Sequence, residues 1–235
     1  RRIRAVGHPH LEGFALRRRR AGSLRRADLR TTWGLKPGEK LLCFASETYG
    51  LKYDRSYRFR PLSRSLERTV IILEHLLSAI GRISRTGRVK VRMINKIHPK
   101  NRPSEFRWLL RRPLPCPVHT VHRAENGSLV RAADLVVGMT SMFLTEATYL
   151  GAPVLHILPR PQEEGLLQDV ARFNPVARDP GELDRQLRRM LDQRVPRRSR
   201  ALRRFEQRHR GATGRIVRGV YGILKARNAF TKRES

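Results

Sequence analysis

The chain has 235 residues, and its 51 lysines and arginines against 20 aspartates and glutamates give a formal net charge of +31. Hydrophobic residues make up 39% of it, which is enough for a packed core. No apolar run approaches the roughly 20 residues of a membrane span. Aromatic residues, at 6%, are too few for a stacking platform that binds single-stranded nucleic acid.

The positive charge has several interpretations. It suits binding to nucleic acid, to an anionic membrane surface or to anionic small molecules. Arginine also far outnumbers lysine, as the compositional bias of a GC-rich coding sequence would produce. No helix-turn-helix, zinc-finger or RNA-recognition signature is present, so specific nucleic-acid binding is not expected. Cys43 and Cys116 lie in apolar runs without a CxxC spacing, which predicts buried free thiols in a reducing cytoplasm.

Apolar runs and helical periodicities alternate along the chain. A short β-like run spans Ile3–Phe14, and a basic amphipathic helix follows and ends at Gly34. After them the pattern predicts strands within 40–46, 89–94, 116–121, 135–139, 153–159 and 174–178. Helices are predicted within 62–83, 103–112, 127–134, 141–150, 163–172 and 179–194, with two more near the C-terminus that meet at Gly211.

Six alternations of this kind indicate βαβ units and a doubly wound, Rossmann-like parallel sheet with helices on both faces. The strands are apolar throughout, as expected when both faces of a sheet are covered. The predicted organisation is a linker and basic helical lead-in at 1–39, a Rossmann-like domain at 40–195, and C-terminal helices at 196–235. These helices pack back on the domain or on a partner domain.

Ligands of open parallel sheets bind beyond the carboxyl ends of the strands. Four polar stretches follow predicted strands and should converge there. They are Ser46-Glu47, Lys96–Lys100, Gly138–Ser141 and Pro159–Glu163. No His/Cys/Asp/Glu spacing suggests zinc, and no dinucleotide, P-loop or hydrolase-elbow motif occurs.

The stretch that begins at Gly138 is the most informative of the four. Gly138 permits a sharp turn, and Thr140 and Ser141 are good N-cap residues for the helix that follows. The N–H groups and positive dipole end of that helix make a phosphate site. Glu146, further along the helix, could accept hydrogen bonds from a ribose diol. The alternative is a simple helix cap followed by a solvated acid.

Lys96 and His98 form a second candidate pair. Their spacing along an extended segment places both side chains on one side, near a phosphate held by the helix at Ser141. Lysine supplies a point charge and histidine a donor. The alternative is a surface turn in a basic protein.

The order of motifs resembles that of a known family. "GHPHLEGF" is followed by "LLCFASE", "INKIHPKN", "AADLVVGMTSMFLTEATYLGAPVLHILP" and "GATGRIVRGVYGIL". Together they resemble the C-terminal, nucleotide-sugar-binding half of a GT-B glycosyltransferase, in the branch of UDP-N-acetylglucosamine 2-epimerase and surface-polysaccharide transferases. The resemblance covers nearly the whole chain, and the stretch from Ala133 to Leu155 is its most specific part.

The resemblance implies roles for the residues that match. Ser141, with Thr140 and Met142, would hold the donor diphosphate after the turn at Gly138. Glu146 would bind the ribose hydroxyls. His98 would approach the diphosphate, assisted by Lys96. The catalytic residues stay unknown, and neither a metal nor a cofactor is expected.

The resemblance also implies an activity and its partners. The donor would be a UDP- or CDP-linked sugar, used in synthesis of surface polysaccharide or glycoconjugate. The acceptor site and the catalytic base would belong to an N-terminal GT-B domain, so the isolated chain is not expected to turn over. The location implied is the cytoplasm, with peripheral contact at the inner, anionic face of the membrane as a further option.

Some residues depart from the family pattern, and other functions stay open. His8 and Glu12 replace the Asn and Asp frequent in such linkers, and Thr140–Met142 replaces the Ser-Gly-Gly run of the epimerases. That last difference disfavours the first alternative, an epimerase-like protein. The second alternative is a nonenzymatic basic module that binds nucleic acid or anionic membrane.

Overall fold

A computed structural model describes residues 6–9, 12–13, 26–87, 89–167, 169–192 and 207–231. The chain divides into two compact units. The sheet unit is Ser23–Arg197, and the terminal unit combines Arg1–Gly22 with Arg198–Ser235.

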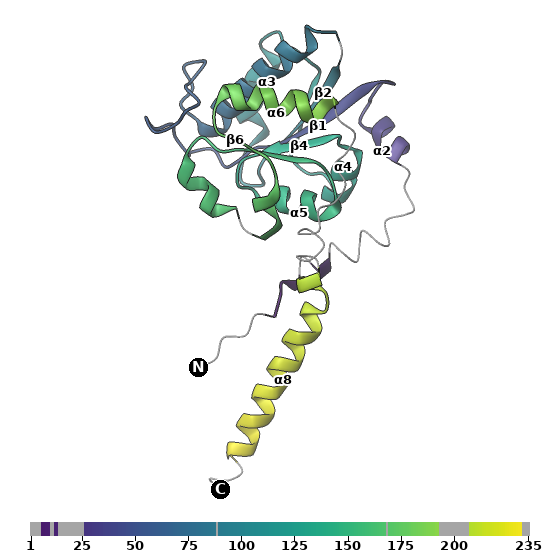
Figure 1. The fold of residues 1–235 in the computed structure, drawn as a ribbon, viewed down its shortest axis with the longest axis vertical. Coiled ribbons are helices and arrows are strands. Elements are labelled where there is room, and N and C mark those ends of the chain that lie inside the picture. The colour runs from purple at the N-terminus through teal and green to yellow at the C-terminus, as the bar shows by residue number, and fades with distance from the viewer. Residues whose placement is uncertain are drawn as a thin grey trace. The chain divides into compact units, whose positions relative to one another are not determined.

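The sheet unit is built on six parallel strands (Figure 1). Their order in the sheet is β3-β2-β1-β4-β5-β6, which confirms the predicted doubly wound, Rossmann-like sheet. In register, Ala45 at the end of β1 lies beside Lys96 of β2 and Gly138 of β4, so three strands end level with one another. The strands are β1 (Glu39–Ala45), β2 (Lys90–Lys96), β3 (Val118–Val121), β4 (Leu135–Gly138), β5 (Val154–Ile157) and β6 (Val176–Ala177).

Helices cover both faces of the sheet, as Figure 1 shows for α3 and α6 on one side and α4 and α5 on the other. The first face carries α3 (Arg68–Ser84), α6 (Pro180–Asp192) and the 3-10 helix η2 (Pro103–Leu110). The second carries α2 (Arg26–Thr32), α4 (Asn126–Ala132) and α5 (Met142–Leu150). Both faces of β1 are therefore buried, which explains why its side chains are apolar from Leu41 onward.

Two predicted helices differ from those in the structure. The helix predicted from residue 62 begins at Arg68, because Glu67 has an extended backbone and forms an antiparallel bridge with Lys52, and residues 62–64 are bends. The helix predicted within 163–172 is replaced by two 3-10 helices, η3 (Pro161–Leu166) and η4 (Asp169–Phe173). Leu167, with φ −73° and ψ 102°, has an extended backbone that ends η3.

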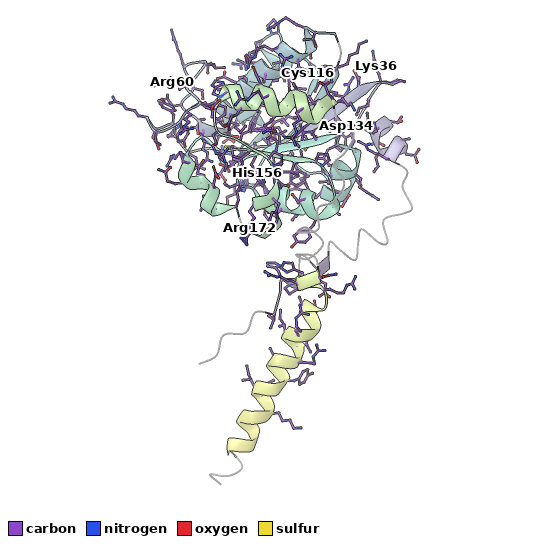
Figure 2. The ribbon with its side chains drawn as sticks, viewed as in Figure 1. Lys36, Arg60, Cys116, Asp134, His156 and Arg172 are labelled. Carbon is purple, nitrogen blue, oxygen red and sulfur yellow. The ribbon has the colours of Figure 1, made fainter. Side chains whose placement is uncertain are left out.

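The lead-in helix α2 belongs to the sheet unit, whose boundary lies at Ser23 rather than at residue 40. The carboxylate of Asp134 explains this difference. It pairs with Arg26 at 2.8 Å and Arg30 at 2.6 Å, and it accepts the N–H of Leu41 at 2.7 Å. Asp134 precedes β4 and Leu41 lies in β1, so one carboxylate fastens α2 to two central strands (Figure 2).

The terminal unit joins the two ends of the chain. Glu12 caps α8 (Ala212–Thr231) by accepting the N–H groups of Gly211 at 2.5 Å and Thr213 at 2.9 Å. Arg215 donates from Nε to the carbonyl of Val6 at 3.0 Å. The β-like run predicted for 3–14 is wrong where it can be examined, since residues 9, 12 and 13 are helical. Its other residues, apart from 6–8, lie outside the described part of the chain.

Helix α8 leaves many of its apolar side chains exposed. These side chains have exposed fractions between 46% and 71% and belong to Val217, Val220, Tyr221, Ile223 and Leu224. The helix contains four basic residues and no acidic one. Among the described residues, no helix is both long enough and apolar enough to cross a membrane.

Candidate functional site

The order of the strands defines where a ligand would bind. The connection after β1 runs to α3 on one face of the sheet, and the connection after β4 runs to α5 on the other face. Because β1 and β4 are neighbours, a crevice opens where these connections part, as at the switch point of dinucleotide-binding folds. Strands β2, β1, β4 and β5 are adjacent, so the four predicted polar stretches all lie at this edge.

Glu47 bridges the crevice beyond the end of β1. Its Oε1 accepts the N–H of Thr140 at 3.0 Å and the Thr140 hydroxyl at 2.8 Å. Asn101 donates from Nδ2 to the Glu47 carbonyl at 2.8 Å, and the hydroxyl of Thr69 accepts the Glu47 N–H at 3.2 Å. Glu47 is buried, so the turn after β4 is fixed by groups within the sheet unit.

The first turn of α5 is arranged as expected for an anion site. The Ser141 hydroxyl accepts the N–H of Phe143 at 3.3 Å and caps the helix. The N–H groups of Ser141 and Met142 precede the helical ladder and have no partner within the helix. Met142 is 55% exposed. Because α5 follows β4 at the switch point, the positive end of its dipole lies at the carboxyl edge of the sheet.

Gly138 acts through close packing. A Cβ at this position would lie 2.9 Å from Cδ1 of Leu144 and 3.0 Å from the carbonyl oxygen of Ala45. Glycine is therefore needed at the end of β4 so that α5 and β1 can approach the strand. The sharp turn expected here follows one residue later, as a bend at Met139 and Thr140.

Lys96 and His98 are brought beside this turn from the end of β2. The ammonium of Lys96 lies 5.0 Å from the centre of the Phe143 ring in the first turn of α5. The His98 N–H donates to the hydroxyl of Ser46 at 3.0 Å, which joins the ends of β2 and β1. Both residues thus lie at the predicted crevice.

The ring of His98 has a defined donor and acceptor. Its Nδ1 accepts the N–H of Lys100 at 3.2 Å, so the neutral ring carries its hydrogen on Nε2. Partial burial and the nearby ammonium of Lys100 lower the pKa of His98 below its ordinary value. At neutral pH the ring is therefore uncharged, with an Nε2–H group able to donate to an anion.

Glu146 is buried and already has a protein partner. Its Oε2 accepts a hydrogen bond from Nδ2 of Asn126 at 2.8 Å. Asn126 is the first residue of α4 and follows the carboxyl end of β3, so this pair lies at the rim of the crevice. Sequence reasoning did not identify Asn126, because nothing in the local pattern relates the start of α4 to the middle of α5.

A buried arginine, Arg68, is the main residue that sequence reasoning missed. Its Nη1 lies 2.8 Å from Oε1 of Glu163, and its Nε lies 3.4 Å from Oε2 of Glu47. Burial raises the pKa of the Glu163 carboxyl despite the neighbouring charge of Arg68. The available signal was an arginine at the start of a helix in which Val70–Leu73 are all apolar, because a buried guanidinium requires acidic partners.

His156 supports the turn after β4 from within the sheet. Its Nδ1 donates to the carbonyl of Met139 at 2.6 Å, which leaves Nε2 to accept from Nδ2 of Asn174 at 3.2 Å. Asn174 also donates to the hydroxyl of Thr148 on α5 at 2.7 Å. Figure 2 labels His156, which is almost completely buried.

The sheet unit and the terminal unit contain no group of three or more His, Cys, Asp or Glu side chains that could hold a metal ion, within the part of the chain described. Scanning the sequence against protein-family profiles gives no match, and neither does a comparison with curated protein sequences.

Solved structures do match. One is UDP-GlcNAc 2-epimerase from Methanocaldococcus jannaschii, at a TM-score of 0.54 and 16% identity, covering 92% of this chain and 55% of that one. Another is the epimerase from Neisseria meningitidis bound to UDP-GlcNAc, at 0.52 and 12%, covering 92% and 54%. A third is an α,α-trehalose-phosphate synthase (UDP-forming) from Burkholderia xenovorans, at 0.52 and 14%, covering 88% and 47%.

These matches establish the fold. The chain has the α/β Rossmann-like fold of one half of a GT-B glycosyltransferase or UDP-GlcNAc 2-epimerase. It spans about half the length of the solved structures that it matches.

Proposed function

We propose that this chain is the nucleotide-sugar-binding half of a glycosyltransferase-like enzyme of surface-polysaccharide or glycoconjugate synthesis. The observation that carries the proposal is the crevice between β1 and β4, where the capped N-terminus of α5 meets Lys96 and His98. A helix N-terminus flanked by a lysine and a neutral histidine donor suits the diphosphate of a nucleotide sugar.

The remaining groups suit the rest of the nucleotide. Glu146 is held at the rim by Asn126, and its carboxylate would accept the two hydroxyl groups of a ribose. A UDP- or CDP-linked donor is the expected substrate. During transfer of the sugar, negative charge develops on the diphosphate leaving group, and the α5 N–H groups, Lys96 and His98 would stabilise that charge without a metal ion.

A second α/β half is the expected partner. Support comes from the coverage of the solved structures, since this chain covers only 55% and 54% of the length of the two epimerases. The exposed apolar face of α8, which includes Val220 and Ile223, is a surface that such a half would cover. The acceptor site and the catalytic base would then lie on that half, so we expect no turnover by this chain alone.

Calorimetric titration with UDP, CDP, GDP and dTDP tests the binding function. We expect one nucleoside diphosphate to bind, with Glu146→Ala weakening it by about tenfold or more through loss of the ribose contacts. Asn126→Ala, which removes only the partner of Glu146, should weaken binding less. If no nucleotide binds, or if Glu146→Ala binds as tightly as the wild type, the function is refuted.

Lysines at the two ends of β2 provide a test variant and a matched control for diphosphate binding. Lys96→Gln should weaken binding of the nucleoside diphosphate about tenfold and leave binding of the uncharged nucleoside unchanged. Lys90→Gln removes the same charge from the exposed opposite end of the same strand and should change neither affinity. Equal losses in both variants would mean that the protein's general positive charge, rather than this crevice, attracts the nucleotide.

Membrane contact is the alternative explanation for the exposed apolar face of α8. A vesicle-binding experiment distinguishes it from docking of a second half. Co-sedimentation with phosphatidylglycerol vesicles that is abolished by Val220→Asp and Ile223→Asp would assign the apolar face of α8 to lipid. Under our proposal these substitutions leave vesicle binding unchanged.

A further inference from the structure

A cavity of about 640 Å³ opens next to the crevice, on the α3 side of the sheet. It lies between the loop after β1, the first residue of α3 and the segment after β5. The polar side chains that line it belong to Lys52, Ser56, Tyr57, Arg68, Arg160, Gln162 and Glu163.

Three basic side chains line this cavity, and each is held in place by an acidic partner. Lys52, Arg68 and Arg160 share the lining with one carboxylate, that of Glu163, and Lys52 also pairs with Glu67. Arg68 is fixed by its contacts with the two buried acids at the crevice. Arg160 donates from Nη2 to the Tyr57 hydroxyl at 3.1 Å, and its guanidinium lies 4.7 Å from the centre of that ring. It also pairs with Asp54 at 2.6 Å.

Both guanidinium groups keep a donor that is not used. Nη2 of Arg68 and Nε of Arg160 are buried and meet no hydrogen-bond acceptor among the residues that the structure describes. Side-chain burial of Arg68 exceeds nine-tenths, with 9% exposed. A buried donor without an acceptor costs free energy, which an incoming oxyanion with several lone pairs would recover.

The cavity is connected to the proposed diphosphate site. Glu47 touches Arg68 on one side and Thr140, in the turn before α5, on the other. A ligand whose diphosphate lies at the start of α5 would therefore have its nonnucleotide part within reach of the cavity. We propose that this cavity is an oxyanion subsite, which binds a carboxylate or phosphate group on the sugar-sized part of a substrate between Arg68 and Arg160.

This inference rests on the proposed function and adds the charge of the substrate. The anionic group can belong to the transferred sugar of the donor or to a separate acceptor. Both sources offer the same chemistry to the two guanidinium groups, so the experiment treats them as two arms.

The first arm compares two donors by calorimetry. UDP-glucuronate and UDP-glucose differ in a single carboxylate, and the wild-type protein is expected to prefer the former by about tenfold. Arg160→Gln should reduce that preference to about one while UDP alone binds unchanged. Arg188→Gln, an exposed arginine of α6, removes the same charge elsewhere and should keep the preference.

The second arm compares glucose 6-phosphate with glucose in the presence of saturating UDP. A preference for the phosphate that requires Arg160 assigns the subsite to an acceptor, whereas a preference confined to the donor pair assigns it to the transferred sugar. Either result supports the proposal. Should Arg160→Gln fold poorly, Lys52→Gln is a second variant, because the Lys52 side chain is 62% exposed. It is expected to weaken binding of the anionic ligand about threefold.

The proposal is overturned if neither arm shows a preference, or if the preference survives in Arg160→Gln. Failure of the underlying function has a different signature, because UDP itself then does not bind the wild-type protein. In that event both the proposed function and the oxyanion subsite are refuted.

Discussion

Glu47 and Thr140 are 93 residues apart in the chain, and the carboxylate of the first accepts both the N–H and the hydroxyl of the second, at 3.0 and 2.8 Å. This contact joins the end of β1 to the turn before α5 across the crevice. The same carboxylate lies against Arg68, so one side chain connects the two neighbouring candidate subsites. The geometry of the site therefore depends on one buried acid.

Replacing the hydroxyl of Thr140 tests this contact. Thr140→Val keeps the shape of the side chain but removes one hydrogen bond to a buried carboxylate, so we expect the free energy of unfolding to fall by about 1 kcal/mol. Thr140→Ser retains the hydroxyl and should lose less. Urea unfolding of the three proteins gives the comparison, and equal stability of the valine variant would show that the hydroxyl contributes nothing.

Much of the fold follows from the sequence, because apolar runs alternate with helical periodicities and such strands are buried on both faces. The position of the crevice follows as well, since parallel strands such as β2 and β4 place their carboxyl ends at one edge. The partners within the crevice do not follow. Whether Glu146 meets Asn126, or Arg68 meets Glu163, depends on how α4, α5 and the loop after β5 cross in space.

The lengths of the elements were also only partly predictable. The periodicity before Arg68 is helical in pattern, but Glu67 pairs with Lys52 in an antiparallel bridge and the residues before it form bends instead of helical turns. Long-range pairing of this kind overrides local propensity, and a single sequence gives no sign of it.

The stability of the sheet unit should depend on the protonation of His156. Burial lowers the pKa of His156 below 6.5, more than its hydrogen bond to the Met139 carbonyl raises it. The unfolded chain therefore binds a proton that the folded chain does not, and the free energy of unfolding falls as the pH falls from 6.5 toward the folded pKa. Each unit of pKa depression corresponds to about 1.4 kcal/mol.

Urea unfolding of wild type and His156→Asn at pH 7.5 and pH 5.5 isolates this contribution. Asparagine can still donate toward the Met139 carbonyl but does not titrate, so its stability should fall less on acidification. His75 is also buried and shifts in the same direction, but it is present in both proteins. A parallel fall in the two proteins would contradict the assignment to His156.

The two thiols should be unreactive in the folded protein. Cys43 and Cys116 are free and buried, as the sequence predicted, and burial raises the pKa of each to about 12. Since the thiolate is the reactive form, a rise from 9.0 reduces its population about a thousandfold. Ellman's reagent at pH 8 should therefore titrate both thiols rapidly in urea and only slowly without it, with Cys43→Ala and Cys116→Ala separating the two. Fast native labelling of Cys43 would contradict its burial in β1.

The carboxylate of Asp134 is expected to hold α2 on the sheet. Asp134→Asn removes ion pairs at 2.8 Å with Arg26 and 2.6 Å with Arg30. Arg26 is about half exposed and solvent screens its pair, so most of the expected loss of about 1 to 2 kcal/mol comes from Arg30. Trypsin should then cleave within α2 faster than in the wild type, because local opening of that helix becomes easier.

Asp184→Asn is the matched control for α2. Asp184 pairs with Arg82 at 2.7 Å and joins α6 to α3, on the opposite face from α2. Its loss should destabilise the sheet unit by a similar amount without exposing α2 to trypsin. Faster cleavage of α2 in both variants would mean that the whole unit opens, rather than the helix alone.

Acid should release α2 in the same way as Asp134→Asn. Burial raises the pKa of the Asp134 carboxyl, but the hydrogen bonds from Arg30 and the Leu41 N–H outweigh it and keep the pKa below the ordinary 3.8. Its contribution to stability is therefore complete above pH 3.8 and is lost as the pH falls through the folded pKa. Pepsin, which is active in acid, should cut near Leu29 at pH 2 in both wild type and Asp134→Asn. At pH 4 it should cut Asp134→Asn faster than the wild type. Equal cleavage of the two proteins at pH 4 would show that this carboxylate does not retain the helix.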